Sequence, residues 1–365
     1  MVLRNVQALR AVAAFLVVLF HMGDAQGLER RYISSDVNLT QPFGTFGNFG
    51  VDLFFVISGF IMIVTTWEQF GRPGASLHFF SRRIVRIYPP YWLILVPITA
   101  VYLVRPDFVN SHSSVPPDLV ASYLLLPQAG WPLLLVSWSL VAEMEFYLVF
   151  TLALALRRAL LPAVVALWFA SIAAIGVLFA HSANPYAQFL QSWMPLEFAL
   201  GMGAGALAMT KRLHAPLTAT VVGTLVLTGT CAALASPAHP VLGTWTGFAL
   251  ISLPCALLLY GVVGLERLRG LAAPAFLVLC GDASYAIYLW HIPILSAVGR
   301  LVVQLHLHGW VAHAVVDLLF LGLVTGISIA VYRFAERPMT RALNRRLHTL
   351  QSPRTTVPSE AGAPG

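Results

Sequence analysis

Charged side chains are scarce in this sequence. They make up only 10% of its 365 residues, whereas soluble proteins carry about 25%. Hydrophobic residues make up 58% of the chain, and its mean hydropathy is +0.78. This composition excludes an ordinary soluble protein. It predicts an all-α, polytopic membrane helix bundle, because apolar stretches long enough to cross a bilayer recur along the whole chain.

Lysine and cysteine are also rare. Arginine occurs 21 times and lysine once, so the formal charge of +7 rests almost entirely on guanidinium groups. The cysteines are Cys231, Cys255 and Cys280, which lie apart in apolar stretches without pairing or metal-ligand spacing. We therefore expect no metal site. The positive charge indicates membrane orientation and an anionic ligand, and we expect no nucleic acid partner.

The apolar stretches predict about ten transmembrane helices. Their approximate ranges are 6–23, 49–67, 88–104, 136–156, 159–180, 193–210, 215–235, 244–264, 284–304 and 311–333. With a cytoplasmic N-terminus, most basic residues between the spans fall on the inner side, so we predict that both termini are cytoplasmic. We assign residues 1–346 to one transmembrane domain and residues 347–365 to a disordered cytoplasmic tail. The expected location is the cell inner (plasma) membrane.

The first predicted span contains two ionisable residues, Arg10 and His21. His21 follows Arg10 by eleven positions, which corresponds to roughly 16 Å of rise along a helix, at about 1.5 Å per residue. Ionisable groups inside a membrane are costly, which makes them candidates for function. The structural alternatives are an arginine that extends to the lipid headgroups and a histidine that caps its helix.

Three carboxylates could accompany His21 on the predicted outer side. Glu143 lies inside the fourth span, Asp52 lies near the outer end of the second span, and Asp24 follows His21 by three residues. A histidine beside a carboxylate is held in one tautomer and can act as a general base on a hydroxyl group. The alternative role for Asp52 is to cap its helix. Ser58 lies near the middle of the same span as Asp52.

A basic stretch leads into the third predicted span. Arg82, Arg83 and Arg86 lie within about one helical turn, so two of them can converge on an anionic ligand such as a phosphate. The structural alternative is anchoring of the helix at the cytoplasmic surface. The Pro89-Pro90 pair that follows would fix a turn or start the helix.

Two stretches near the end of the chain carry further polar groups. In the ninth span, Tyr285, Tyr288 and His291 fall on one side of the helix. They are either site residues or part of a hydrogen-bonded seam between helices. At the exit of the last span, Glu336 and Arg337 would form a structural ion pair.

Six stretches together resemble the acyltransferase 3 family of integral-membrane O-acyltransferases of carbohydrates. In family order they are LRNVQALRAVAAFLVVLFH, FGVDLFFVISGFIM, RRIVRIYPPYW, SWSLVAEMEFY, SYAIYLWHIPIL and AERP. They extend from residue 3 to about residue 339, so the resemblance covers essentially the whole transmembrane domain.

The resemblance implies acyl transfer from a cytoplasmic acyl-CoA, usually acetyl-CoA, to a sugar hydroxyl at or beyond the membrane. Arg10 and His21 match the family's essential pair. The catalytic residues that we predict are His21 as general base, Glu143 and Arg10. The predicted donor site is Arg82, Arg83 and Arg86, and the predicted substrate contacts are Asp52, Ser58, Tyr147, Tyr288 and His291.

The expected partners are acyl-CoA, membrane lipid and an acceptor, which would be a surface polysaccharide, a glycolipid or a lipid-linked sugar. Two other functions fit the same sequence. One is acylation of a hydrophobic small molecule such as an antibiotic. The other is transport of a small carboxylate, which needs neither CoA nor a base at His21.

Overall fold

The computed structural model describes residues 3–23, 39–109, 113–192, 194–210, 213–235 and 244–351. Within these ranges the chain consists of helices and their connections, and it contains no β-strand. The prediction of an all-α fold is therefore confirmed.

Nine helices in this part of the chain are long and apolar enough to cross a membrane. Their bounds are Arg4–Gly23 (α1), Phe49–Thr66 (α4), Ala75–Val104 (α5), Leu135–Ala155 (with α7, Trp138–Ala155), Arg158–Leu178 (with α8, Leu161–Leu178), Pro216–Leu234 (α11), Phe248–Arg269 (with α13, Leu253–Arg269), Ser284–Leu305 (with α15, Ser284–Val302) and Trp310–Thr349 (with α16, Trp310–Val331). The remaining α-helices are α3 (Phe43–Phe46), α6 (Leu119–Leu124), α9 (Pro185–Leu190), α10 (Pro195–Met209), α12 (Thr244–Gly247), α14 (Ala275–Asp282) and α17 (Arg337–Gln351).

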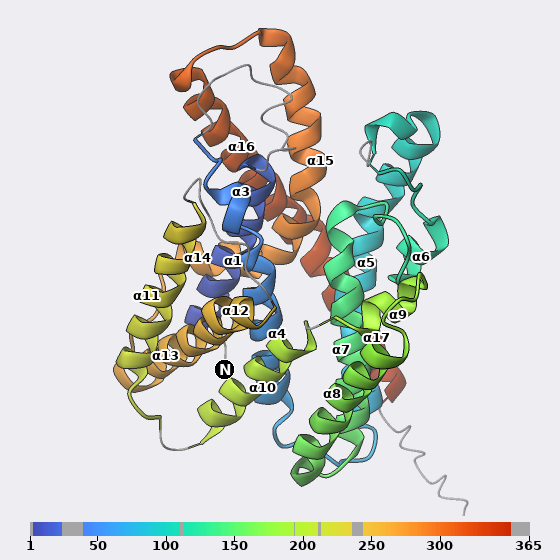
Figure 1. The fold of residues 1–365 in the computed structure, drawn as a ribbon, viewed down its shortest axis with the longest axis vertical. Coiled ribbons are helices and arrows are strands. Elements are labelled where there is room, and N and C mark those ends of the chain that lie inside the picture. The colour runs from blue at the N-terminus through green and yellow to red at the C-terminus, as the bar shows by residue number, and fades with distance from the viewer. Residues whose placement is uncertain are drawn as a thin grey trace, which may run out of the picture.

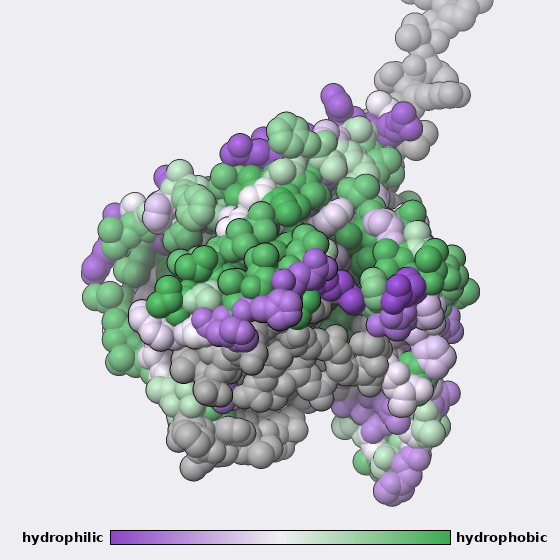
Figure 2. Space-filling view, turned by 90° about the horizontal axis from the view of Figure 1, so that it is seen from above, coloured by the Kyte–Doolittle hydropathy of each residue, from purple (hydrophilic) through white to green (hydrophobic). Residues whose placement is uncertain are grey.

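Hydrophobic side chains cover wide areas of the molecular surface (Figure 2). On α8, the side chains of Leu167 and Val177 are 71% and 80% exposed. A soluble protein of this size would bury most residues of such an apolar helix. Together with the nine helices of spanning length, this surface identifies a multi-pass membrane protein with lipid around it.

The sixth predicted span and the predicted tail both differ from the structure. The span at 193–210 forms α10, whose 15 residues rise only about 22 Å, less than the ~30 Å of bilayer hydrocarbon. α10 packs against α4 and α13. The tail predicted from residue 347 is helical as far as Gln351, because α17 continues the last span. Residues 352–365 lie outside the described part of the chain.

The third span begins well before the predicted position. α5 starts at Ala75 and runs for 30 residues through Pro89, Pro90 and Pro97. Each proline removes one helical hydrogen bond, but Tyr91 and its apolar neighbours are buried against the core and hold the helix together there. The basic stretch is therefore part of the helix and not its entrance.

The helices form two groups that face each other (Figure 1). In one group, α1 and α10 pack against α4, while α11 packs against α13. The other group contains α5, α7 and α8, and α17 packs along α5. α15 contacts α1 in the first group and α5 in the second. Side chains from both groups meet at this boundary, where the candidate site lies.

Glycines bring the backbones of α4 and α10 into contact. A Cβ atom on Gly201 would lie 1.9 Å from the carbonyl oxygen of Val56, and one on Gly59 would lie 2.0 Å from that of Phe198. No side chain fits at either position, so these glycines set the distance between the two helices. A Cβ atom on Gly203, also in α10, would meet no atom within 4 Å.

Candidate active site

A cavity of about 100 Å³ lies between the two helix groups. Its polar lining includes Arg10 from α1, Ser58 from α4, Arg83 and Arg86 from α5, Glu143 and Tyr147 from α7, and Tyr288 from α15. Seven of the residues predicted from the sequence therefore converge, although they come from five helices. Arg82 is exposed and does not line the cavity, contrary to the predicted donor site of three arginines.

Glu143 is held by hydroxyl groups. The Tyr147 hydroxyl and the Ser58 Oγ both donate to Oε1 of Glu143, the latter at 3.3 Å. The Arg83 guanidinium lies 5.5 Å from the centre of the Tyr147 ring, which brings a positive charge close to the carboxylate. Within the described chain, the hydrogen bonds of Glu143 go to these two hydroxyls and not to His21, which Glu143 was predicted to orient or polarise.

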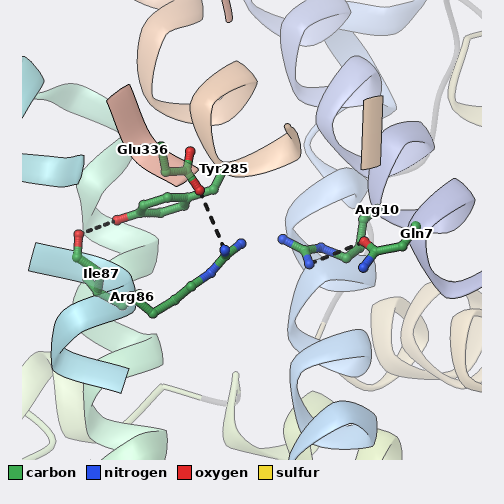
Figure 3. A network of polar contacts seen from close by, with 6 residues as sticks. All are labelled: Gln7, Arg10, Arg86, Ile87, Tyr285 and Glu336. Carbon is green, nitrogen blue, oxygen red and sulfur yellow. Dashed lines mark hydrogen bonds and ion pairs between the residues drawn. The ribbon is translucent and has the colours of Figure 1, made fainter. Parts of the chain in front are cut away.

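Two other arginines point toward each other across the cavity (Figure 3). Arg86 forms an ion pair with Glu336, with 3.5 Å between Nη1 and Oε1. Arg10 donates to Oε1 of Gln7 at 3.4 Å. The predicted ion pair between Glu336 and Arg337 is wrong, because Glu336 is buried beside Arg86 while Arg337 is exposed.

Positive charge exceeds negative charge around the cavity. Arg10, Arg83 and Arg86 line it, together with one carboxylate, Glu143, and with Glu336 nearby. The buried Nε of Arg83 has no hydrogen-bond partner within the described chain. A buried cationic donor without a partner is costly unless a ligand supplies an acceptor. The cavity is therefore suited to an anionic or strongly polarised ligand.

His21 does not line the cavity but lies next to a second histidine, His291. The ring centres of His21 and His291 are 5.2 Å apart, and that of Tyr288 is 6.0 Å from His291. Nδ1 of His291 lies 2.7 Å from the carbonyl oxygen of Tyr288, so Nδ1 carries the proton. Nε2 of His291 is buried and has no partner among the residues described. A chain of rings thus connects His21 to Tyr288 at the cavity wall.

Asp52 belongs to a different cluster. Its carboxyl group lies beside that of Glu197 on α10, whose Oε1 accepts from the Ser252 hydroxyl at 3.0 Å. Asp52 therefore lies where α4 meets α10 and does not line the cavity, contrary to its predicted contact with substrate. Asp24 lies outside the described residues.

Three further polar residues at the site were not predicted from the sequence: Gln7, Ser139 and Ser284. Ser139 and Ser284 line the cavity, and Oγ of Ser139 lies 2.6 Å from the Tyr288 hydroxyl. Gln7 lies one helical turn before Arg10, which is a spacing that could have revealed it. Among the residues that the structure describes, no three His, Cys, Asp or Glu side chains are grouped as metal ligands.

The chain is similar to several membrane acyltransferases. The acyltransferase-domain model of the Acyl_transf_3 family matches residues 3–333. The exopolysaccharide production protein ExoZ of Rhizobium meliloti (strain 1021) is 34% identical over 321 residues, which cover 81% of this chain and 90% of ExoZ. The putative membrane-bound transacylase BcsY of Komagataeibacter xylinus is 27% identical over 92% of this chain and 82% of BcsY. The O-acetyltransferase OatA of Staphylococcus aureus is 24% identical over 93% of this chain and 57% of OatA. No solved structure matches the chain.

The family match covers nearly all of the membrane-spanning part of the chain. It includes all the arginines, hydroxyls and carboxylates at the cavity except Glu336. The resemblance seen in the sequence is therefore confirmed. The chain belongs to the acyltransferase 3 family and is a multi-pass membrane enzyme that transfers acyl groups other than aminoacyl groups.

Proposed function

We propose that this protein is an O-acyltransferase of the inner (plasma) membrane that moves an acyl group from cytoplasmic acyl-CoA to a hydroxyl of a surface polysaccharide, glycolipid or lipid-linked sugar. The observation that carries the proposal is the cavity where Arg10, Arg83 and Arg86 meet Glu143. The names of two relatives, an exopolysaccharide production protein and an O-acetyltransferase, support a carbohydrate hydroxyl as acceptor.

The donor fits the charge of the cavity. Acyl-CoA carries phosphates and a polarised thioester carbonyl, and both accept hydrogen bonds from guanidinium groups. Arg83 has an unused buried donor, and Arg86 and Arg10 extend into the same space. We assign Arg83 and Arg86 to donor binding and Arg10 to stabilising the charge that develops on the carbonyl oxygen.

His21 is the proposed base. A ring nitrogen of His21 takes the proton from the sugar hydroxyl, whose oxygen forms a bond to the thioester carbonyl carbon. The carbon–sulfur bond then breaks, and CoA leaves as a thiolate that takes up the proton. His291 and Tyr288 connect His21 to the cavity wall and position it. Glu143 keeps the Tyr147 and Ser58 hydroxyls oriented.

We expect acetyl-CoA to be a better donor than acyl-CoA with a longer chain. The volume of this cavity is only about 100 Å³, below the ~300 Å³ at which typical small-molecule sites begin. An acetyl group fits this space, whereas a longer chain would have to displace packed side chains such as Phe54 and Phe55. The measurement is initial transfer rate with acetyl-, butyryl- and octanoyl-CoA. Equal rates with all three donors would contradict the assignment of this cavity to the acyl group.

The donor site can be tested with two neighbouring arginines. Arg83→Ala should weaken acetyl-CoA binding at least tenfold, because a charge-assisted hydrogen bond contributes about 1.5–3 kcal/mol. Arg82→Ala removes the same charge one residue earlier, from an exposed position outside the cavity, and should change binding little. Isothermal titration of the protein in lipid nanodiscs with acetyl-CoA measures both dissociation constants.

An equal loss of acetyl-CoA affinity in Arg83→Ala and Arg82→Ala would show that the donor responds to surface charge and not to the cavity. If the protein binds no acetyl-CoA but carries a small carboxylate across the liposome membrane, transport replaces acyl transfer as its function.

A further inference from the structure

A second, larger cavity lies at the N-terminal end of α7. Its volume is about 630 Å³, which is within the range of ~300–1,000 Å³ typical of small-molecule sites. It is lined by the segments before and after α6, by the start of α7, and by α9 with the segment that follows it. Figure 1 shows α6 and α9 on the same side of α7. We call this cavity the α7 groove.

The α7 groove opens on the predicted outer side of the membrane. Its lining comes mainly from the connection between α5 and α7 and from the connection between α8 and α10. With a cytoplasmic N-terminus, α1, α5 and α8 run outward, so both connections lie outside. This is the side from which the proposed acceptor approaches.

The α7 groove is aromatic and polar but uncharged. Trp131 is 52% exposed, and Trp138 forms part of the wall. No described residue that lines the groove carries a charge. Gln188 donates through Nε2 to the carbonyl oxygen of Ser182 at 3.2 Å, and its Oε1 accepts no hydrogen bond within the described chain.

This combination matches the chemistry of a neutral sugar. The C–H face of a pyranose ring packs on an indole ring, while its hydroxyls need amide and hydroxyl partners. Trp131 offers the ring, and Gln188 and Ser192 offer polar atoms beside it. A charged headgroup or a phosphate would find no counter-charge in this groove.

One helix separates the α7 groove from the arginine cavity. Trp138 and Val141 face the groove, whereas Ser139 and Glu143 on the same helix face the cavity. An α-helix with its side chains is about 10–12 Å across. A sugar in the groove therefore lies one helix diameter from the reacting centre, at a distance that suits a neighbouring residue of the same glycan.

We propose that the α7 groove is a subsite for a neutral sugar residue of the acceptor, with Trp131 as its stacking platform. The residue bound there is a neighbour of the one that receives the acyl group. This inference rests on the proposed function, because it requires a carbohydrate acceptor.

The test measures binding of cellotetraose, a neutral hexose oligomer, to the full chain in nanodiscs by saturation-transfer NMR. Trp131→Ala should weaken binding about tenfold, as truncation of an aromatic contact residue typically does. The matched control is Trp310→Ala, whose side chain is 64% exposed at the start of α16 and lies outside the groove. It should leave binding unchanged. Gln188→Leu, a second exposed groove residue, should also weaken binding if the groove holds the sugar.

Unchanged binding in Trp131→Ala and Gln188→Leu, or no binding by the wild type, overturns the subsite. Transfer of acetyl groups to an envelope glycan extract is measured separately. Cellotetraose binding without any transfer leaves a neutral-sugar site in the groove, but it removes the proposed function and with it the role of that site for an acceptor. Transfer without cellotetraose binding removes the subsite alone.

Discussion

His21→Ala should lower acyl transfer by about 10²–10⁴-fold, which is the range that general base catalysis contributes. The variant loses the group that takes the proton from the sugar hydroxyl, while the arginines of the cavity remain. Acetyl-CoA binding should therefore stay close to that of the wild type. The measurement follows transfer of a radiolabelled acetyl group from acetyl-CoA to an extract of host glycolipids, with the protein in liposomes.

His181→Ala is the control for removal of a histidine, since His181 is exposed in the connection after α8. It should keep full activity. His291→Ala tests the positioning role, because the two rings lie 5.2 Å apart. Full activity of His21→Ala, with loss of transfer in His291→Ala, would give the base role to His291.

Gly201→Ala should destabilise the protein by about 3 kcal/mol, the upper part of the range for overpacking. The new methyl group would lie 1.9 Å from the carbonyl oxygen of Val56. That oxygen belongs to the backbone of a helix, so it cannot move aside without separating α4 from α10. Asp52 on α4 and Glu197 on α10 would move apart with the two helices. The measurement is the melting temperature of the detergent-solubilised protein.

Gly203→Ala provides the matched control on the same helix. Its methyl group meets no atom within 4 Å, and alanine favours the helix by up to about 1 kcal/mol over glycine. The two substitutions are chemically identical but should shift the melting temperature in opposite directions. A similar drop of the melting temperature in both variants would mean that these glycines act through helix flexibility and not through close packing.

Hydropathy was sufficient to predict most spans but failed where charge lies inside a helix. The span predicted at 215–235 is α11, Pro216–Leu234, to within one residue at each end. The span predicted to start at residue 88 starts at Ala75 instead. Arg83 and Arg86 caused the difference, because their charges suggest an aqueous surface although their side chains line a cavity inside the bundle.

The site partners on other helices could not be predicted, because a sequence does not show how helices are rotated against each other. Depth placed Glu143 and Asp52 near His21, but Glu143 accepts from Ser58 on α4, and Asp52 lies beside Glu197 on α10. Tyr147, the other partner of Glu143, lies one turn along the same helix, which is a spacing that could have revealed it. The α7 groove was missed for another reason. Trp131 and Gln188 lie in or beside connections without periodicity, where no pattern indicates which residues meet.

Arg10 and Arg86 extend toward each other from the two helix groups. Two like charges that face each other repel, and an anion bound between them attracts both. If acyl-CoA is that anion, its binding raises the free energy of unfolding of the helix bundle by mass action. The increase is about 2.7 kcal/mol when the acyl-CoA concentration is a hundred times the dissociation constant. Depletion of the donor in a cell would then shorten the lifetime of the folded enzyme as well as slow its reaction.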